Sequence, residues 1–125
     1  MERAQINRRK NRSSDVQVAL SFQLAATARR AKFTALVLAD ELGLVVAAVG
    51  HKPTGEKMAA LAPMLTARTR TFHGSMKTST GPVRVSIAPV SMEGVRLYLC
   101  AAEGEAAEIT RELFTGGLGV TRILA

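Results

Sequence analysis

Hydrophobic positions recur along this chain with two periods, one typical of helices and one typical of strands. A repeat of four predicts an amphipathic helix over residues 14–32. Its apolar positions are Val16, Leu20, Leu24 and Ala28, flanked by Val18 and Phe22. Ser14 and Gln17 have the spacing of a capping box, so we expect the helix to begin there.

A strand hairpin is predicted next. Residues 33–39 are apolar apart from Thr34, which is typical of a strand buried on both faces. Residues 40–43 read Asp-Glu-Leu-Gly, a turn signal, and the apolar run over residues 44–49 then closes the hairpin.

A second helix is expected over residues 55–67, capped by Thr54 or Gly55 after a loop that contains Pro53. Pro63 lies inside it and should kink it or split it, because proline removes a backbone donor and clashes with the preceding turn.

Three further strands and a last helix complete the pattern. Residues 69–78 have weak strand character, whereas the other two strands alternate apolar and polar positions, as strands with one exposed face do. Those two strands span residues 83–90, with Pro89 at an edge or a bulge, and residues 95–100. The helix is expected over residues 103–114, with Ala107, Ile109 and Leu113 inward and Gly116-Gly117 as its end.

The order helix-strand-strand-helix-strand-strand-strand-helix predicts an α+β sandwich, with one five-stranded antiparallel sheet between helices. A chain of 125 residues of which 47% are hydrophobic can fill one such core. We expect a single domain over residues 14–125.

The charge changes the picture only at the N-terminus. Residues 1–32 hold eight basic and two acidic residues, whereas residues 33–125 hold nine and eight. A nearly neutral body does not favour nucleic-acid binding. Residues 1–13 are interpreted as a basic, flexible arm, and contact with phosphates or acidic partners is the alternative.

No apolar run is long enough to span a membrane, and no signal-peptide core follows the basic start. Cys100 is the only cysteine, which fits a reducing compartment, and it is expected in the core. We therefore expect a cytoplasmic protein with no membrane partner.

Candidate chemistry is sparse. The loop from Gly50 to Lys57 begins like a phosphate-binding loop, but Glu56 and Met58 replace the lysine and hydroxyl that such a loop needs. His51, His73 and Cys100 lack the spacings of a zinc site. We expect no catalytic residues, no metal and no cofactor, and hence no enzyme.

Surplus apolar surface is the informative feature. Met58, Leu61, Met64 and Leu65 lie on the second helix and belong either to the core or to a dimer interface. The strand after this helix has only its hairpin partner to pair with in sequence. An unpaired sheet edge must be blunted or covered, and pairing with a second copy is one way to do so.

The hairpin, the Ala/Leu-rich helix and the closing strands and helix resemble the roadblock (dynein light chain) superfamily, whose bacterial branch includes MglB-like and MglC-like regulators of polarity and gliding motility. The resemblance covers about residues 14–115, and the hairpin Phe33–Gly50 carries most of it. It implies a homodimer through the second helix and the next strand. The implied interface residues are Met58, Leu61, Met64, Leu65, Phe72 and His73.

The resemblance also implies a non-enzymatic function. Members bind small Ras-like GTPases or other roadblock proteins, and regulate or scaffold them. A small-ligand-sensing α/β domain is the alternative, and it would need a roomy pocket between helix and sheet.

Deleting residues 1–13 should leave the melting temperature unchanged, because apolar periodicity begins only after Ser14. Thermal unfolding followed by circular dichroism measures this. A large drop in the melting temperature would show that the deleted segment stabilises the domain.

Overall fold

The computed structural model describes residues 2–66, 71–92 and 94–125, which form three helices and five strands. Their order agrees with the expected order. In chain order they are α1 (Glu2–Ala31), β1 (Phe33–Ala39), β2 (Val45–Gly50), α2 (Lys52–Leu65), β3 (Phe72–Thr78), β4 (Gly81–Met92), β5 (Val95–Glu103) and α3 (Ile109–Leu124).

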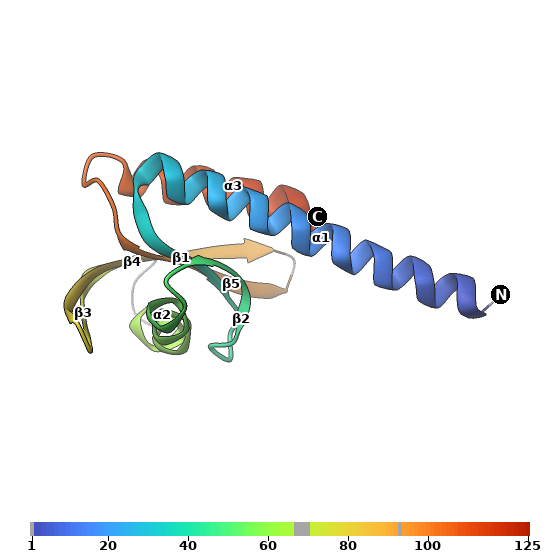
Figure 1. The fold of residues 1–125 in the computed structure, drawn as a ribbon, viewed down its shortest axis with the longest axis horizontal. Helices are drawn as coiled ribbons and strands as arrows, with labels where there is room; N and C mark the ends of the chain where they lie inside the picture. The colour runs from blue at the N-terminus through green and yellow to red at the C-terminus, as the bar shows by residue number, and fades with distance from the viewer. Residues whose placement is uncertain (1, 67–70, 93) are drawn as a thin grey trace.

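The five strands form one antiparallel sheet in the order β2-β1-β5-β4-β3. Figure 1 shows α1 and α3 on one side of this sheet and α2 on the other. The predicted α+β sandwich is therefore confirmed. The strands β2 and β3 are the two edges of the sheet.

The first hairpin forms as its residues predict. Strand β1 has the expected bounds, and all of it except Thr34 is buried. In the turn, the Asp40 carboxylate accepts hydrogen bonds from the backbone N–H groups of Leu42 and Leu44, at 2.9 and 3.0 Å. Gly43 adopts a φ of 80°, so glycine suits this turn.

Each face of the sheet has its own core. On the α1 and α3 face, Leu20 and Leu24 of α1 pack with Leu36, Leu38 and Leu99 of the strands. On the α2 face, Met58, Ala59 and Ala62 of α2 pack with Val37 and Ile87, among others. The central strands β1 and β5 contribute to both clusters, which explains why their buried runs do not alternate.

Pro89 pairs with Tyr98 of the neighbouring strand β5. The described residues of β3 pair with β4 as far as Phe72 opposite Ile87, and the position that would face Pro89 on that side lies outside the described residues. The expected place of Pro89 at an edge or a bulge therefore remains a prediction.

The helix α1 begins at Glu2, so the expected start at Ser14 is wrong. Ser14 and Gln17 lie inside a continuous helix. The side-chain amide of Gln17 donates a hydrogen bond to the backbone carbonyl of Val46 in β2 and does not cap the helix. The division of the chain at residue 13 remains a prediction.

The start of α2 also differs from the expected one. His51 is the N-cap, and its Nδ1 accepts the backbone N–H of Thr54. Pro53 thus lies in the first turn of the helix, where a proline costs no hydrogen bond. Pro63 does not split α2, which continues to Leu65 because the proline stands in its last turn. The expected end at Ala67 lies outside the described residues.

The helix α3 runs from Ile109 to Leu124, through the glycines that were expected to end it. A Cβ at Gly116 would lie 3.1 Å from Thr27 of α1, and one at Gly119 would lie 2.4 Å from Gln23. The two helices therefore pack closely because these positions lack side chains. Ala107, expected inside the helix and facing inward, is exposed and precedes it.

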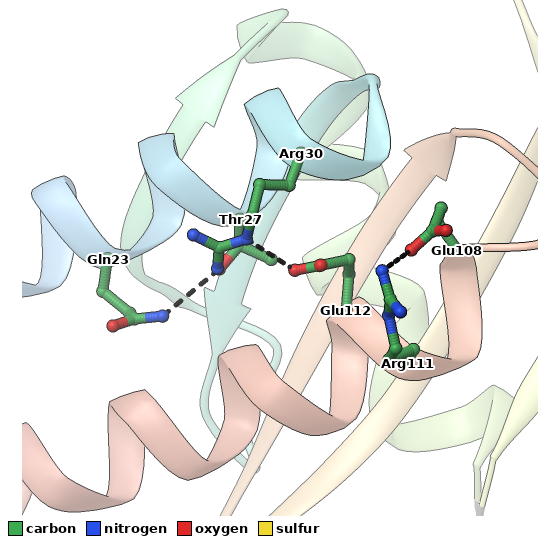
Figure 2. Close-up of polar contacts among 6 residues, drawn as sticks. All are labelled: Gln23, Thr27, Arg30, Glu108, Arg111 and Glu112. Atoms are coloured by element: carbon green, nitrogen blue, oxygen red, sulfur yellow. Dashed lines mark hydrogen bonds and ion pairs between the residues drawn. The ribbon is translucent and has the colours of Figure 1, made fainter.

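An ion pair joins α1 to α3 (Figure 2): the Nε of Arg30 donates to the carboxylate of Glu112 at 2.9 Å. Within α1, the hydroxyl of Thr27 accepts hydrogen bonds from Gln23 at 3.3 Å and from Arg30 at 3.5 Å. Glu112 is 7% exposed and Arg30 is 48% exposed. A carboxylate this buried needs its partner, because an unpaired buried charge is costly.

Replacing Gly50 by alanine should destabilise the protein by about 3 kcal/mol or more, since a positive φ and a backbone clash combine there. Gly50 has a φ of 87°, and its Cβ would lie 2.3 Å from the carbonyl oxygen of Thr34. Gly94→Ala is the matched control: its φ is 68°, with open space around it, so only about 1 kcal/mol of backbone strain is expected. Urea unfolding measures both, and equal losses would contradict the proposed clash.

Replacing Arg30 by alanine should cost about 1–2 kcal/mol, because it leaves the Glu112 carboxylate buried without its cation, and half-exposure of Arg30 moderates the loss. Lys52→Ala breaks an exposed pair with Glu56 and should leave the free energy of unfolding essentially unchanged. Chemical denaturation compares the two variants. An Arg30 variant as stable as the Lys52 variant would show that the buried pair contributes nothing.

Candidate interaction surface at the edge strand β3

The strand β3 forms one edge of the sheet. Within the described part of the chain it pairs with β4 and has no partner strand on its other side. Its outer backbone N–H and C=O groups can therefore pair with another extended chain. The described strand has seven residues, enough for a regular ladder.

Apolar side chains of α2 pack against the same core cluster as Phe72 of this edge. Leu61 and Leu65, one helical turn apart, are half-buried against the α2-side core, together with Phe72 and Val83. The Lys57 ammonium bonds the backbone carbonyl of Lys77 and so ties α2 to β3. Met64, on the outer side of the helix, is 67% exposed. We call Leu61, Met64, Leu65 and Phe72 the α2–β3 strip.

The groups that could carry chemistry are engaged in structural contacts. The segment that begins like a phosphate-binding loop forms the start of α2. There the hydroxyl of Thr54 lies 2.8 Å from Nδ1 of His51, and Lys52 pairs with Glu56 one helical turn away. Burial raises the pKa of the Cys100 thiol to about 12. A thiol with such a pKa is hardly ionised near neutral pH, so Cys100 is a poor nucleophile.

Among the residues whose positions are described, no three His, Cys, Asp or Glu side chains lie close enough to hold a metal ion. One carboxylate near the surface is perturbed. The backbone N–H and the guanidinium of Arg84 donate hydrogen bonds to the carboxylate of Glu103. These bonds lower the pKa of the Glu103 carboxyl. This contact joins the neighbouring strands β4 and β5.

In the described residues, no helix combines the length and the hydrophobicity needed to cross a membrane.

Comparisons with known proteins place the fold. No protein-family model matches this sequence, and no curated protein matches it. Solved structures do match. A roadblock/LC7 domain from Streptomyces avermitilis shares 22% identity at a TM-score of 0.63, over 83% of this chain and 96% of that one. The fold is that of the roadblock superfamily.

Two MglB structures agree with this fold. The gliding protein MglB from Thermus thermophilus is 15% identical, with a TM-score of 0.62, over 86% of this chain and 90% of that one. An MglB structure with a tetrameric arrangement is also 15% identical, with a TM-score of 0.63, over 86% and 89% of the two chains.

One residue assigned to the dimer interface by resemblance requires correction. Met58 has no exposed surface and packs in the α2-side core of this roadblock fold. Its side chain cannot reach a second chain in this conformation. Leu61, Met64, Leu65 and Phe72 keep accessible surface, and their role at an interface remains a prediction.

The side chain of His73 does not share a face with that of Phe72, and its place at an interface remains a prediction. Phe72 packs on the α2 side, whereas Nδ1 of His73 lies 3.1 Å from the Ser86 hydroxyl and faces the α3 side. Adjacent strand residues point to opposite faces, and the sequence alone contains that information. The backbone of His73 still lies along the β3 edge.

A groove that the sequence does not predict lies on the other face of the sheet at the same edge. It has a volume of about 510 Å³, and its residues come from α3, β4 and the start of β3. Phe114 and Leu118 of α3 border it and are 69% and 50% exposed. The last helix was expected over residues 103–114. Its expected range therefore includes Phe114 but not Leu118. The continued apolar spacing Leu113, Val120 and Ile123 was the available signal.

Proposed function

We propose that this chain is a non-enzymatic homodimeric interaction module that regulates or scaffolds a small Ras-like GTPase system. In this proposal the module binds the GTPase itself or a second roadblock protein, in the cytoplasm of a bacterial cell and in a process such as polarity or gliding motility. The likeness of the fold to MglB structures supports this assignment.

The observation that carries the proposal is the open β3 edge beside the α2–β3 strip. A second copy at this edge would continue the sheet through backbone hydrogen bonds and would cover the strip at the same time. A twofold interface presents each residue twice, so the strip would meet its own copy. The tetrameric arrangement of one MglB structure is consistent with chains of this fold assembling.

The alternative is a ligand-sensing domain, and one observation favours it. The groove beside α3 has a volume of about 510 Å³, within the range of roughly 300–1,000 Å³ that small-molecule sites occupy. Capture experiments on the native cytoplasm, with and without GTP, separate the two functions. Recovery of a Ras-like GTPase or another roadblock protein supports the first, and a co-purified metabolite with no such protein contradicts it.

Leu61→Glu and Leu65→Glu should each turn the dimer into a folded monomer. Each change introduces two charges into one twofold interface, so the dissociation constant should rise about a thousandfold. Sedimentation gives the mass, and far-UV circular dichroism reports the fold. Phe22→Glu is the control, because Phe22 is exposed on α1, away from the strip, and the dimer should persist.

An unfolded chain in both leucine variants would assign the strip to the core instead. A dimer that persists in both would contradict the proposed interface.

A further inference from the structure

We propose that the groove between α3 and the β3–β4 hairpin binds an amphipathic helix of a partner protein, one with an apolar face and acidic flanks. We further propose that two copies joined at β3 form one shared site for it. This inference rests on the dimer proposed above.

The wall of the groove has the pattern of a helix-packing surface. Phe114 and Leu118 are one turn apart on α3, both largely exposed, and Leu113 and Gly117 line the groove between them. Side chains four residues apart form the ridges that interlock when helices pack. On the floor, the apolar side chains of Ala88 and Val90 come from β4, and the polar side chain of His73 comes from β3.

The groove opens toward the edge of the sheet. The helix α3 contacts β4 and β5, and no helix of the described chain covers β3 on this face. A second copy paired at β3 would therefore join its own groove to this one. The joint floor would run from β4 through the two β3 strands to the partner's β4.

The spacing of this joint groove suits one additional helix. Because α3 lies over β4 and β5, its axis would stand about two strand spacings, or about 10 Å, from the dimer axis. The two copies of α3 would then be about 20 Å apart, too far to pack together, since packed helices lie about 8–10 Å apart. One helix between them would contact both.

Cationic side chains on β3 and α3 favour a partner helix with acidic flanks. Lys77 is on the groove face of β3 but does not line the groove, because it stands four positions beyond the lining residue His73. Arg122 follows Leu118 by one turn along the α3 wall. Neither cation has an acidic partner among the described residues, and none of the described lining residues is acidic. Carboxylates on the flanks of an apolar helix would complement them.

Two synthetic helical peptides test this proposal on the full-length protein. Both carry leucine at the same apolar positions, and the remaining positions are glutamate in one and lysine in the other. Each is labelled with fluorescein, and binding is followed by fluorescence anisotropy. The glutamate peptide should bind at one peptide per two chains, and the lysine peptide should bind at least about tenfold more weakly.

Variants locate the site. Phe114→Ser and Leu118→Ser should each weaken binding about tenfold or more, because each removes an apolar anchor of the wall. Lys77→Glu and Arg122→Glu should weaken binding of the glutamate peptide and improve that of the lysine peptide. Phe22→Ser and Lys52→Glu are matched controls away from the groove, and they should leave both affinities unchanged.

Sedimentation of the same samples separates this inference from the proposed dimer. A dimer that does not bind the glutamate peptide, or binds both peptides equally, overturns the inference and leaves the dimer intact. A monomeric wild-type chain overturns the dimer and the shared site together. Equal binding by the monomeric Leu61→Glu variant, at one peptide per chain, overturns the shared site alone. A tetramer that Phe114→Ser reduces to a dimer would assign the groove to a second copy of this chain and overturn the helical partner.

Discussion

The burial of β1 and β5 on both faces is the constraint on which the rest of this structure depends. A strand that is apolar on both sides must be covered on both sides. The helices α1 and α3 cover one face of the sheet, and α2 covers the other face (Figure 1). Three helices over five strands leave one edge of the sheet less covered than its centre. In this chain that edge is β3, and both the α2–β3 strip and the α3 groove include residues of β3.

The close contact of α1 with α3 follows from the same constraint. Both helices must fit over the same central strands, and Gly116 and Gly119 allow their axes to approach because they place no Cβ between them. Where the two helices meet, Arg30 of α1 donates a hydrogen bond to the carboxylate of Glu112 of α3. Glycine inside a helix costs about 1 kcal/mol of helix propensity relative to alanine, and tertiary packing outweighs that cost here. For this reason the prediction that Gly116-Gly117 would end α3 was wrong, and the helix continues to Leu124.

Local patterns predicted the parts of the fold that depend on local physics. The bounds of β1 and the turn at Asp40 follow from an apolar run and an Asp-x-x-Gly sequence, and both agree with the structure. The start of α2 was wrong because His51, an uncommon cap, allows Pro53 to stand in the first turn. The start of α1 was wrong because the capping residues Ser14 and Gln17 also fit a helix interior.

The candidate surface could be predicted only in part, because a helical repeat identifies an apolar face without telling what covers it. Met58 and Leu61 belong to the same apolar side of α2, but the sheet covers the first completely and the second only partly. That difference depends on the spatial order of the strands in the sheet, and local sequence patterns do not predict this order. The opposite directions of Phe72 and His73, by contrast, follow from strand geometry alone.

The α2–β3 strip and the α3 groove lie on opposite faces of a single edge, and this placement couples them. Pairing at β3 would complete both surfaces in one step, because the added strands extend the sheet beneath each. A ligand that binds only the paired form stabilises that form in proportion to the logarithm of its concentration. An occupant of the groove would therefore strengthen a dimer whose apolar contact is on the other face of the sheet. The sheet edge itself would transmit this coupling, with no change of conformation required in either chain.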